Sequence, residues 1–131
     1  MFNKISIIGC GLIGSSILRA VEEKKLASKV SAYDKSISVN SYLKENFSAE
    51  ICKNISDVVK NSDLVIIASP LSSYKEILLS IQSNLKENTI LTDTGSAKKE
   101  VNKIISNLNF KKINWIASHP IAGTEYSGPE A

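Results

Sequence analysis

The sequence predicts an α/β fold, a doubly wound parallel sheet with helices on both of its faces. Short apolar runs alternate with longer segments of helical periodicity along the chain, which is the order of elements in such a sheet. The apolar runs are continuous, as in strands that are buried on both faces. A glycine-rich turn directly follows the first run. Because crossovers between parallel strands are right-handed, we expect the strand order 3-2-1-4-5-6.

The strands are predicted at the apolar runs. These are Lys4–Ile8, Val30–Tyr33, Leu64–Ala68, Thr89–Thr92 and Trp115–Ser118, with a short edge strand at Ile51-Cys52. The intervening segments predict helices. The first helix is expected to bury Leu12, Ile13, Ile17, Ala20 and Val21. The others are Ile37–Phe47, a short helix at Ser56–Lys60 capped by its serine, Ser72–Leu85 and Ala97–Leu108. The spacing within Ser72–Leu85 places Tyr74, Ile77, Leu78, Ile81 and Leu85 on one apolar side.

Composition excludes several classes of protein. The 131 residues are enough for one domain with a buried core, and 43% of them are hydrophobic against 22% charged. No apolar run approaches the roughly 20 residues that a membrane-spanning helix needs. The N-terminus lacks the basic region and cleavage site of a signal peptide. We therefore expect a cytoplasmic protein without a membrane partner.

Charge and cysteine content exclude further classes. The net charge is +3, and the 16 basic residues are scattered rather than gathered with aromatic residues, so no nucleic-acid partner is expected. Cys10 and Cys52 form no CxxC pair and have no histidine nearby in the sequence, which argues against a disulfide framework or a metal site. Both cysteines are expected to be reduced packing residues.

The glycine-rich turn has the spacing GxGxxG, at Gly9, Gly11 and Gly14, between a predicted strand and a predicted helix. Gly9 allows the tight turn, Gly11 lets a pyrophosphate approach the backbone, and Gly14 lets the helix pack closely. The first helical residues, Leu12 and Ile13, offer N–H groups and the positive end of the helix dipole to phosphates. The pattern indicates a dinucleotide site, whereas the alternative is a glycine-rich turn without a ligand.

An acidic residue lies where such a site needs one. Asp34 ends the second strand, 20 residues after Gly14, where a carboxylate can accept hydrogen bonds from the ribose hydroxyls. A carboxylate repels a 2′-phosphate, so NAD is favoured over NADP, although Lys35 and Ser36 weaken that preference. The alternative is an acidic residue in a surface turn.

Ligands of this fold bind beyond the carboxyl ends of the strands, and three further segments lie there. Ser69 and Pro70 follow the fourth strand, and their small neighbours allow a cofactor to pass closely. Ser96 follows the fifth strand, at a place where a helix cap is also common. His119 ends the sixth strand, and it is the side chain best suited to proton transfer near neutral pH. A structural histidine is the alternative.

Five stretches together resemble the prephenate dehydrogenase family, which includes arogenate and cyclohexadienyl dehydrogenases. They are GCGLIGSS at Gly9–Ser16, Asp34, ASP at Ala68–Pro70, DTGSAK at Asp93–Lys98 and HPIAGTEYSG at His119–Gly128. The resemblance implies a Rossmann-type domain and NAD-dependent oxidation of prephenate to 4-hydroxyphenylpyruvate with loss of carbon dioxide, or of arogenate to tyrosine.

The resemblance also implies roles for individual residues. His119 matches the histidine that accepts the proton of the substrate hydroxyl. Ser96 matches a serine that hydrogen-bonds the substrate hydroxyl and the cofactor. Glu125, close to Gly123, matches an acidic position near the entrance of the site, with a gating or pairing role at most. The alternative is a solvated carboxylate in a loop. Asp93 is expected to hold the turn after the fifth strand.

The sequence differs from the family because it contains no counterpart of the family's second domain. Family members carry a second, helical domain that dimerises, closes the site and provides an arginine for a substrate carboxylate, whereas Arg19 is the sole arginine here. We therefore expect residues 1–131 to form an incomplete NAD-binding domain, truncated at the C-terminal edge of its sheet, of a homodimeric parent enzyme. Two alternatives stay open: another Rossmann dehydrogenase of the hydroxyacid kind, and a non-catalytic dinucleotide-binding module.

Overall fold

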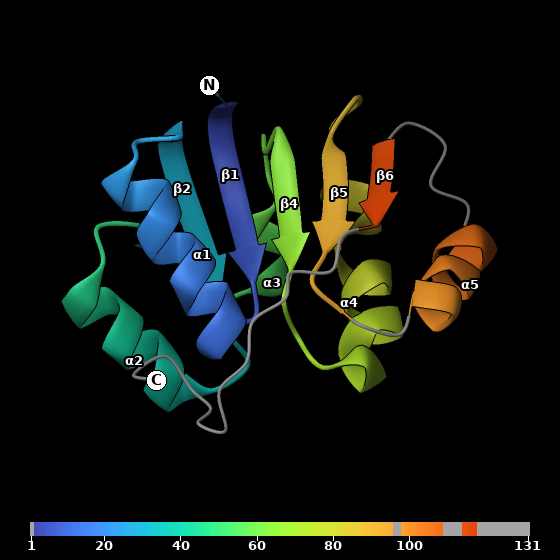
Figure 1. The fold of residues 1–131 in the computed structure, drawn as a ribbon, viewed down its shortest axis with the longest axis horizontal. Coiled ribbons are helices and arrows are strands. Elements are labelled where there is room, and N and C mark those ends of the chain that lie inside the picture. The colour runs from blue at the N-terminus through green and yellow to red at the C-terminus, as the bar shows by residue number, and fades with distance from the viewer. Residues whose placement is uncertain (1, 96–97, 109–113, 118–131) are drawn as a thin grey trace.

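A parallel sheet of six strands forms the centre of the computed structural model, which describes residues 2–95, 98–108 and 114–117 (Figure 1). Its strand order is β3-β2-β1-β4-β5-β6, so the predicted order is confirmed. The strands are β1 (Phe2–Ile8), β2 (Ala27–Tyr33), β3 (Glu50–Ile51), β4 (Leu64–Ile67), β5 (Ile90–Asp93) and β6 (Asn114–Ala117). All pairs are parallel, and the register sets Ile8 opposite both Tyr33 and Ile67.

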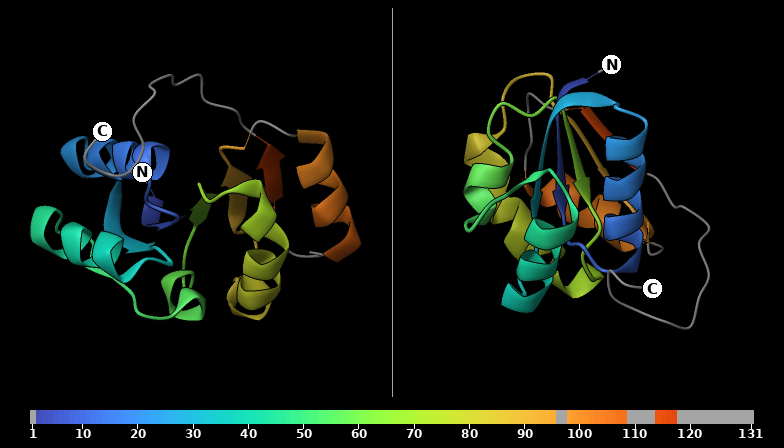
Figure 2. Two further views of the ribbon diagram at one scale, coloured as in Figure 1. Left: turned by 90° about the horizontal axis from the view of Figure 1, so that it is seen from below. Right: turned by 90° about the vertical axis from the view of Figure 1, so that its left-hand side faces the viewer.

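Helices connect the strands by crossovers on both faces of the sheet. They are α1 (Leu12–Glu23), α2 (Ile37–Asn46), α3 (Ile55–Val58), α4 (Tyr74–Ile81) and α5 (Lys98–Leu108). Single turns of 3-10 helix, η1 (Leu71–Ser73) and η2 (Gln82–Asn84), flank α4. Figure 2 shows α1 and α4 on opposite sides of the strands. The chain therefore has the doubly wound architecture that the alternating pattern predicts.

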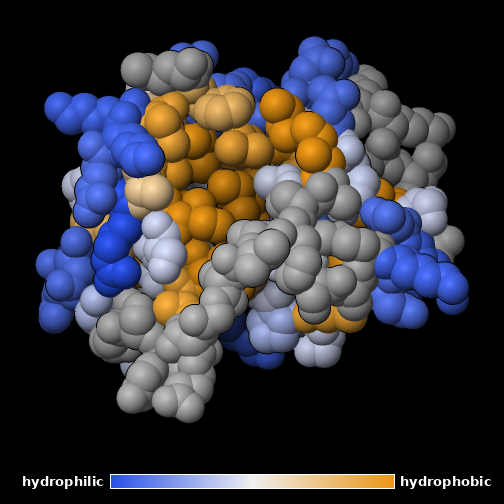
Figure 3. All heavy atoms as spheres, viewed as in Figure 1, coloured by the Kyte–Doolittle hydropathy of each residue, from blue (hydrophilic) through white to orange (hydrophobic). Residues whose placement is uncertain are grey.

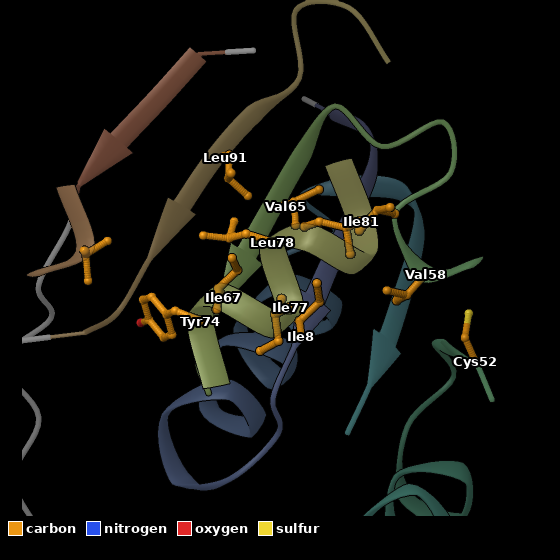
Figure 4. Packing of buried hydrophobic residues seen from close by; sticks show 12 residues of the cluster. Ile8, Cys52, Val58, Val65, Ile67, Tyr74, Ile77, Leu78, Ile81 and Leu91 are labelled. Atoms are coloured by element: carbon orange, nitrogen blue, oxygen red, sulfur yellow. The ribbon is translucent and has the colours of Figure 1, made fainter. Parts of the chain in front are cut away.

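Two apolar clusters fill the spaces between the sheet and its helices. One joins α1 and α2 to one face and includes Ile5, Ile7, Leu18 and Leu43. The other joins α3, α4 and α5 to the opposite face, where the buried residues of α4 point at the strands (Figure 4). Of the predicted apolar side of the fourth helix, Tyr74, Ile77, Leu78 and Ile81 are buried. Leu85 lies beyond α4 and packs against the same cluster only partly buried.

The face of the sheet on the α1 side continues past that helix as an apolar surface (Figure 3). The register places Ile66, Thr92 and Ile116 in one row across β4, β5 and β6 on this face. Ile66 belongs to the cluster under α1 and is 8% exposed, whereas Ile116 at the edge strand is 53% exposed. Burial on this face therefore decreases from the α1 side of the sheet toward β6.

The prediction for the first helix was partly wrong. In the structure, the buried residues of α1 are Gly14, Ser15, Leu18 and Val21. Of the predicted face only Val21 is fully buried, and Leu12, Ile13, Ile17 and Ala20 are half-buried. Small residues face the sheet because α1 lies so close to the turn after β1, which leaves the larger aliphatic side chains on the flanks of the contact.

Two short elements also differ from their predicted positions. The third helix begins at Ile55 rather than Ser56, and its N-cap residue is Asn54, without a side-chain cap hydrogen bond. Ile55 joins the helix because its side chain packs against the apolar cluster. The edge strand is Glu50–Ile51, because Glu50 and Ile51 pair with Ser31 and Ala32, whereas Cys52 lies one residue beyond. Both cysteines are free and buried, as expected.

None of the helices in the described ranges is long and apolar enough to cross a membrane.

Candidate functional site

The candidate site lies at the carboxyl edge of the sheet, where four chain segments meet. Ile8 of β1 is in register with Tyr33 of β2 and Ile67 of β4, and Ile67 is in register with Asp93 of β5. The turns that follow these strands therefore emerge side by side. They carry the predicted glycines, Asp34, Ser69 and Pro70, and the turn at Asp93, so the structure brings these elements to one edge.

The glycine turn is shaped by close packing. Gly9 has φ +89°, a conformation that favours glycine, and a Cβ there would lie 2.7 Å from the backbone nitrogen of Ser69. A Cβ on Gly14 would overlap the carbonyl oxygen of Gly9 and lie 2.9 Å from its carbonyl carbon. Ser69 in turn donates a hydrogen bond of 3.4 Å to the carbonyl of Ile8. The turns after β1 and β4 are thus packed directly against each other.

Gly11 differs from the other two glycines because a Cβ at this position would have no other heavy atom within 4 Å. Gly11 is the N-cap residue of α1, whose first turn carries neither a side-chain cap nor an acidic residue. The first N–H groups of a helix have no partner within it, and the helix dipole makes this end positive. The space over Gly11, next to Leu12 and Ile13, therefore fits an anionic group such as a pyrophosphate.

Asp34 is bound into the glycine turn. Its Oδ2 accepts a hydrogen bond of 2.7 Å from the backbone N–H of Cys10, and its Oδ1 accepts one of 2.8 Å from that of Ser36. Asn40 fixes the backbone, because its side chain donates to the carbonyl of Asp34 at 2.8 Å and accepts from its N–H at 3.0 Å. A carboxylate has about four acceptor positions, so Asp34 keeps capacity for ribose hydroxyls.

Asn40 was missed by the sequence reasoning. It lies on α2, six residues after Asp34, and no motif marks it. Its residue type was the one available signal, because the side chain of an asparagine in a helix of low apolar content can form hydrogen bonds with nearby backbone groups.

The thiol of Cys10 lies at the same turn. Burial, together with the charge of Asp34, raises the pKa of Cys10 to about 12, so this thiol stays protonated near neutral pH. Its role is to fill space under the turn rather than to act as a nucleophile. Among the described residues, no group of three or more potential ligands is placed to hold a metal ion.

Pro70 lies three residues after the end of β4. It is exposed and is the N-cap residue of η1, which leads into α4. The backbone N–H of Ala68 continues the ladder to β1, with a bond of 2.7 Å to the carbonyl of Ile8. Ser69 and Pro70 therefore lie at the edge that also carries the glycine turn.

The turn after β5 is fixed by a buried carboxylate. Oδ2 of Asp93 accepts a hydrogen bond of 2.9 Å from the backbone N–H of Gly95, which confirms that Asp93 holds this turn. The same oxygen accepts one of 3.1 Å from the hydroxyl of Tyr74. Burial, together with the charge of Asp93, raises the pKa of Tyr74, so the phenol is a stable donor. The sequence identified Tyr74 only as a core position.

Four predicted site residues, Ser96, His119, Gly123 and Glu125, lie outside the described residues. Their assigned roles stay predictions.

A separate cleft of about 990 Å³ lies at the opposite, amino edge of the sheet. Its lining includes Lys4, Glu22, Lys29 and Glu50 and none of the predicted site residues. Glu22 is already bonded there, since its carboxylate accepts hydrogen bonds from Ser48 and from the backbone of Ala49. Ligands of parallel α/β sheets bind at the carboxyl edge, so the cleft does not compete with the candidate site.

Proteins of known family resemble this chain in sequence and in structure. A family model described as "Prephenate dehydrogenase, nucleotide-binding domain" matches residues 17–131. The cyclohexadienyl dehydrogenase of Zymomonas mobilis is 37% identical over 132 residues, which is all of this chain and 45% of that protein. The L-aspartate dehydrogenase of Methanocaldococcus jannaschii is 35% identical over 101 residues, 75% of this chain and 38% of that protein.

A similar solved structure is that of prephenate dehydrogenase from A. aeolicus in complex with hydroxyphenyl propionate and NAD⁺. Its TM-score is 0.82 at 29% identity, and the match covers 99% of this chain and 46% of that one. The chain thus spans less than half the length of the relatives that it matches.

Proposed function

The chain belongs to the prephenate dehydrogenase family, and from this premise we propose that it binds NAD as the cofactor part of an enzyme that oxidises prephenate or arogenate. The observation that carries the proposal is the open space over Gly11, at an uncapped helix N-terminus beside the carboxylate of Asp34. A pyrophosphate needs that approach to the backbone, and a ribose needs that acceptor.

Each part of the site has a separate task in holding NAD. Gly9 and Gly14 give the turn its shape, and the N–H groups of Leu12 and Ile13 face the pyrophosphate. Asp34 accepts hydrogen bonds from the adenosine ribose, and its charge disfavours the 2′-phosphate of NADP. Ser69 and Pro70 border the cofactor at the end of β4. The nicotinamide supplies the acceptor for a hydride when NAD is bound.

For the chemical step, we propose His119 as the general base and Ser96 as its partner. The neutral imidazole accepts the proton of the substrate hydroxyl while the carbon that bears it loses a hydride. Loss of the substrate carboxylate as carbon dioxide then makes the ring aromatic. Ser96 orients the hydroxyl, and Glu125 beside Gly123 controls the entrance. Resemblance to the family supports these roles.

The remaining expectations concern the longer protein. We propose that residues 1–131 form an incomplete nucleotide-binding domain, and that a helical domain provides the dimer contacts and the arginine for the substrate carboxylate. The length of the relatives supports this proposal, because each is more than twice as long as the part that the chain matches. The biosynthetic reaction supports a cytoplasmic location.

Calorimetric titration of the chain with NAD and with NADP tests the cofactor proposal. We expect NAD to bind, and to bind more tightly than NADP. Binding of neither nucleotide would contradict the proposal for this chain, and a preference for NADP would contradict the role of Asp34.

A second candidate activity rests on the 35% identity to an L-aspartate dehydrogenase. Formation of NADH is therefore to be measured with prephenate, with arogenate and with L-aspartate, in the wild type and in His119→Asn. Turnover of prephenate or arogenate that His119→Asn abolishes supports the first proposal. Turnover of L-aspartate alone favours the second candidate. Because the proposed helical domain supplies part of the substrate site, these assays use the chain together with that domain. NAD binding without turnover of any substrate then favours a non-catalytic module.

A further inference from the structure

Tyr74 contributes a hydroxyl group to a cluster whose other buried members are aliphatic, apart from Cys52. The residue opens α4, is 0% exposed, and is the largest of the fully buried side chains in the described ranges. Figure 4 shows its ring at the margin of the cluster, with the hydroxyl oxygen directed away from the neighbouring aliphatic groups. A phenylalanine would fill the same space without a buried hydroxyl that needs a partner.

The partner of that hydroxyl is the carboxylate that fixes the turn after β5. Oδ2 of Asp93 accepts two hydrogen bonds, one of 3.1 Å from the hydroxyl of Tyr74 and one of 2.9 Å from the backbone N–H of Gly95. Asp93 is itself 0% exposed, so its charge is stabilised by donors rather than by bulk water. The hydroxyl therefore helps to hold the carboxylate in the position from which it binds Gly95.

Gly95 packs directly on the same hydroxyl. A Cβ on this residue would lie 2.7 Å from the Tyr74 oxygen and 2.9 Å from Oδ2 of Asp93. The backbone of the turn also continues the sheet, since the N–H of Thr94 donates to the carbonyl of Ile67 at 3.0 Å. Side chains from α4 and β5 thus fix one stretch of backbone from two directions.

That stretch lies in the second half of the sheet. A doubly wound sheet binds the two mononucleotides of a dinucleotide on its two halves, across the point where the strand order reverses. Asp34 belongs to the half formed by β1, β2 and β3, and the turn at Asp93 belongs to the half formed by β4, β5 and β6. Two strand spacings of about 4.8 Å separate Asp93 from β1, so the turn lies about 10 Å from the glycine turn.

From these contacts we propose that Tyr74 is a positioning residue, which through Asp93 sets the backbone at Gly95 for the nicotinamide half of the cofactor. The inference rests on the proposed function, since it assigns this turn to one half of bound NAD. It predicts that loss of the hydroxyl weakens NAD, which spans both halves, and leaves ADP, which occupies the adenosine half, unaffected. A residue that only stabilised the fold would change both affinities together or neither.

The test compares Tyr74→Phe with the wild type in calorimetric titrations with NAD and with ADP. We expect NAD affinity to fall about tenfold, the effect of losing one hydrogen bond to a charged group, with ADP affinity unchanged. Tyr42→Phe is the matched control. Tyr42 also loses one hydroxyl contact, with Arg19 at 3.3 Å, but on α2 and away from the turn. It should change neither affinity.

A second measurement needs no ligand. Hydrogen exchange of the Gly95 amide, followed by NMR, should become about tenfold faster in Tyr74→Phe, while amides of β1 keep their wild-type rates. If the wild type binds neither nucleotide, the proposed function fails, and exchange at Gly95 still decides whether Tyr74 positions the turn. Unchanged exchange at Gly95, or an equal loss of NAD and ADP affinity, would overturn the inference.

Discussion

The backbone N–H of Cys10 donates a hydrogen bond of 2.7 Å to the carboxylate of Asp34, which ties the end of β2 to the middle of the glycine turn. The side chain expected to bind a ribose is therefore also part of the turn expected to bind the pyrophosphate. This hydrogen bond fixes the expected ribose position relative to the expected pyrophosphate position, and such preorganisation reduces the ordering that binding requires.

Replacing Asp34 with alanine should weaken NAD binding about tenfold or more, and should reduce the preference for NAD over NADP. The substitution removes the ribose acceptor and also frees the N–H of Cys10 and of Ser36. Titration calorimetry with both nucleotides measures the effect. Asp57→Ala, which removes an exposed acid paired with Lys60, is the charge-matched control. Unchanged affinities in Asp34→Ala would remove this residue from the ribose site.

Replacing Gly14 with alanine should destabilise the fold by about 1–3 kcal/mol, the usual cost of overpacking. The new methyl group would overlap the carbonyl oxygen of Gly9, which is backbone and cannot move aside cheaply. Urea denaturation followed by circular dichroism measures the change as a lower midpoint. A midpoint equal to that of the wild type would mean that α1 can shift away from the turn.

Replacing Gly11 with alanine should weaken NAD binding while leaving the stability of the fold almost unchanged. A methyl group there meets no heavy atom within 4 Å, so the cost in stability should stay below about 1 kcal/mol, the difference between glycine and alanine at an N-cap. NAD affinity should fall about tenfold or more, since the methyl group occupies the approach of the pyrophosphate. The same two measurements, on Gly11→Ala and Gly14→Ala in parallel, separate binding from folding. Unaltered NAD affinity in Gly11→Ala would contradict the site.

Asp63 should make stability depend on pH in the acid range. The hydrogen bond from Lys86, and those from the backbone N–H groups of Asn3 and Lys4, hold the pKa of Asp63 below its usual value. A carboxylate with a lowered folded-state pKa contributes stability above its unfolded pKa of about 3.9, and loses it as pH falls through the folded value. Asp63→Asn should therefore be less stable than the wild type at pH 7, with the difference shrinking below about pH 4.

Urea midpoints of the wild type and Asp63→Asn, taken from pH 7 down to pH 3, provide the measurement. Glu23→Gln, which neutralises an acid at the exposed end of α1, controls for the change in net charge. A difference between Asp63→Asn and wild type that stays constant across the range would assign the effect to packing instead.

The sequence was sufficient for the topology because alternation and continuous apolar runs follow directly from the burial of parallel strands. It was less accurate for α1. Apolar periodicity gives weight to large side chains, whereas Gly14 makes the close contact of this helix with the turn at Gly9, and Ser15 beside it is also buried. Close packing through small residues leaves no hydrophobic signal, so the predicted face was rotated toward the flanks.

In the candidate site too, some residues are marked by a local sequence pattern and others are not. Local spacing was enough to find Gly11 and Asp34, since the motif encodes a turn and a distance along the chain. Tyr74 and Asp93 are 19 residues apart, and their hydrogen bond depends on how α4 packs on β5. Only tertiary structure brings such a pair together, so no local pattern could have marked it.

The strand order also constrains how the chain acquires its structure during synthesis. The turn at Gly9 packs against Ser69, and β1 gains its neighbour β4 only when residues 64–67 exist. The chain up to Ser69 must therefore leave the ribosome before the earliest motif can take its final shape. Contacts between segments so distant in sequence slow folding, and until they form, the apolar first strand is open to other chains.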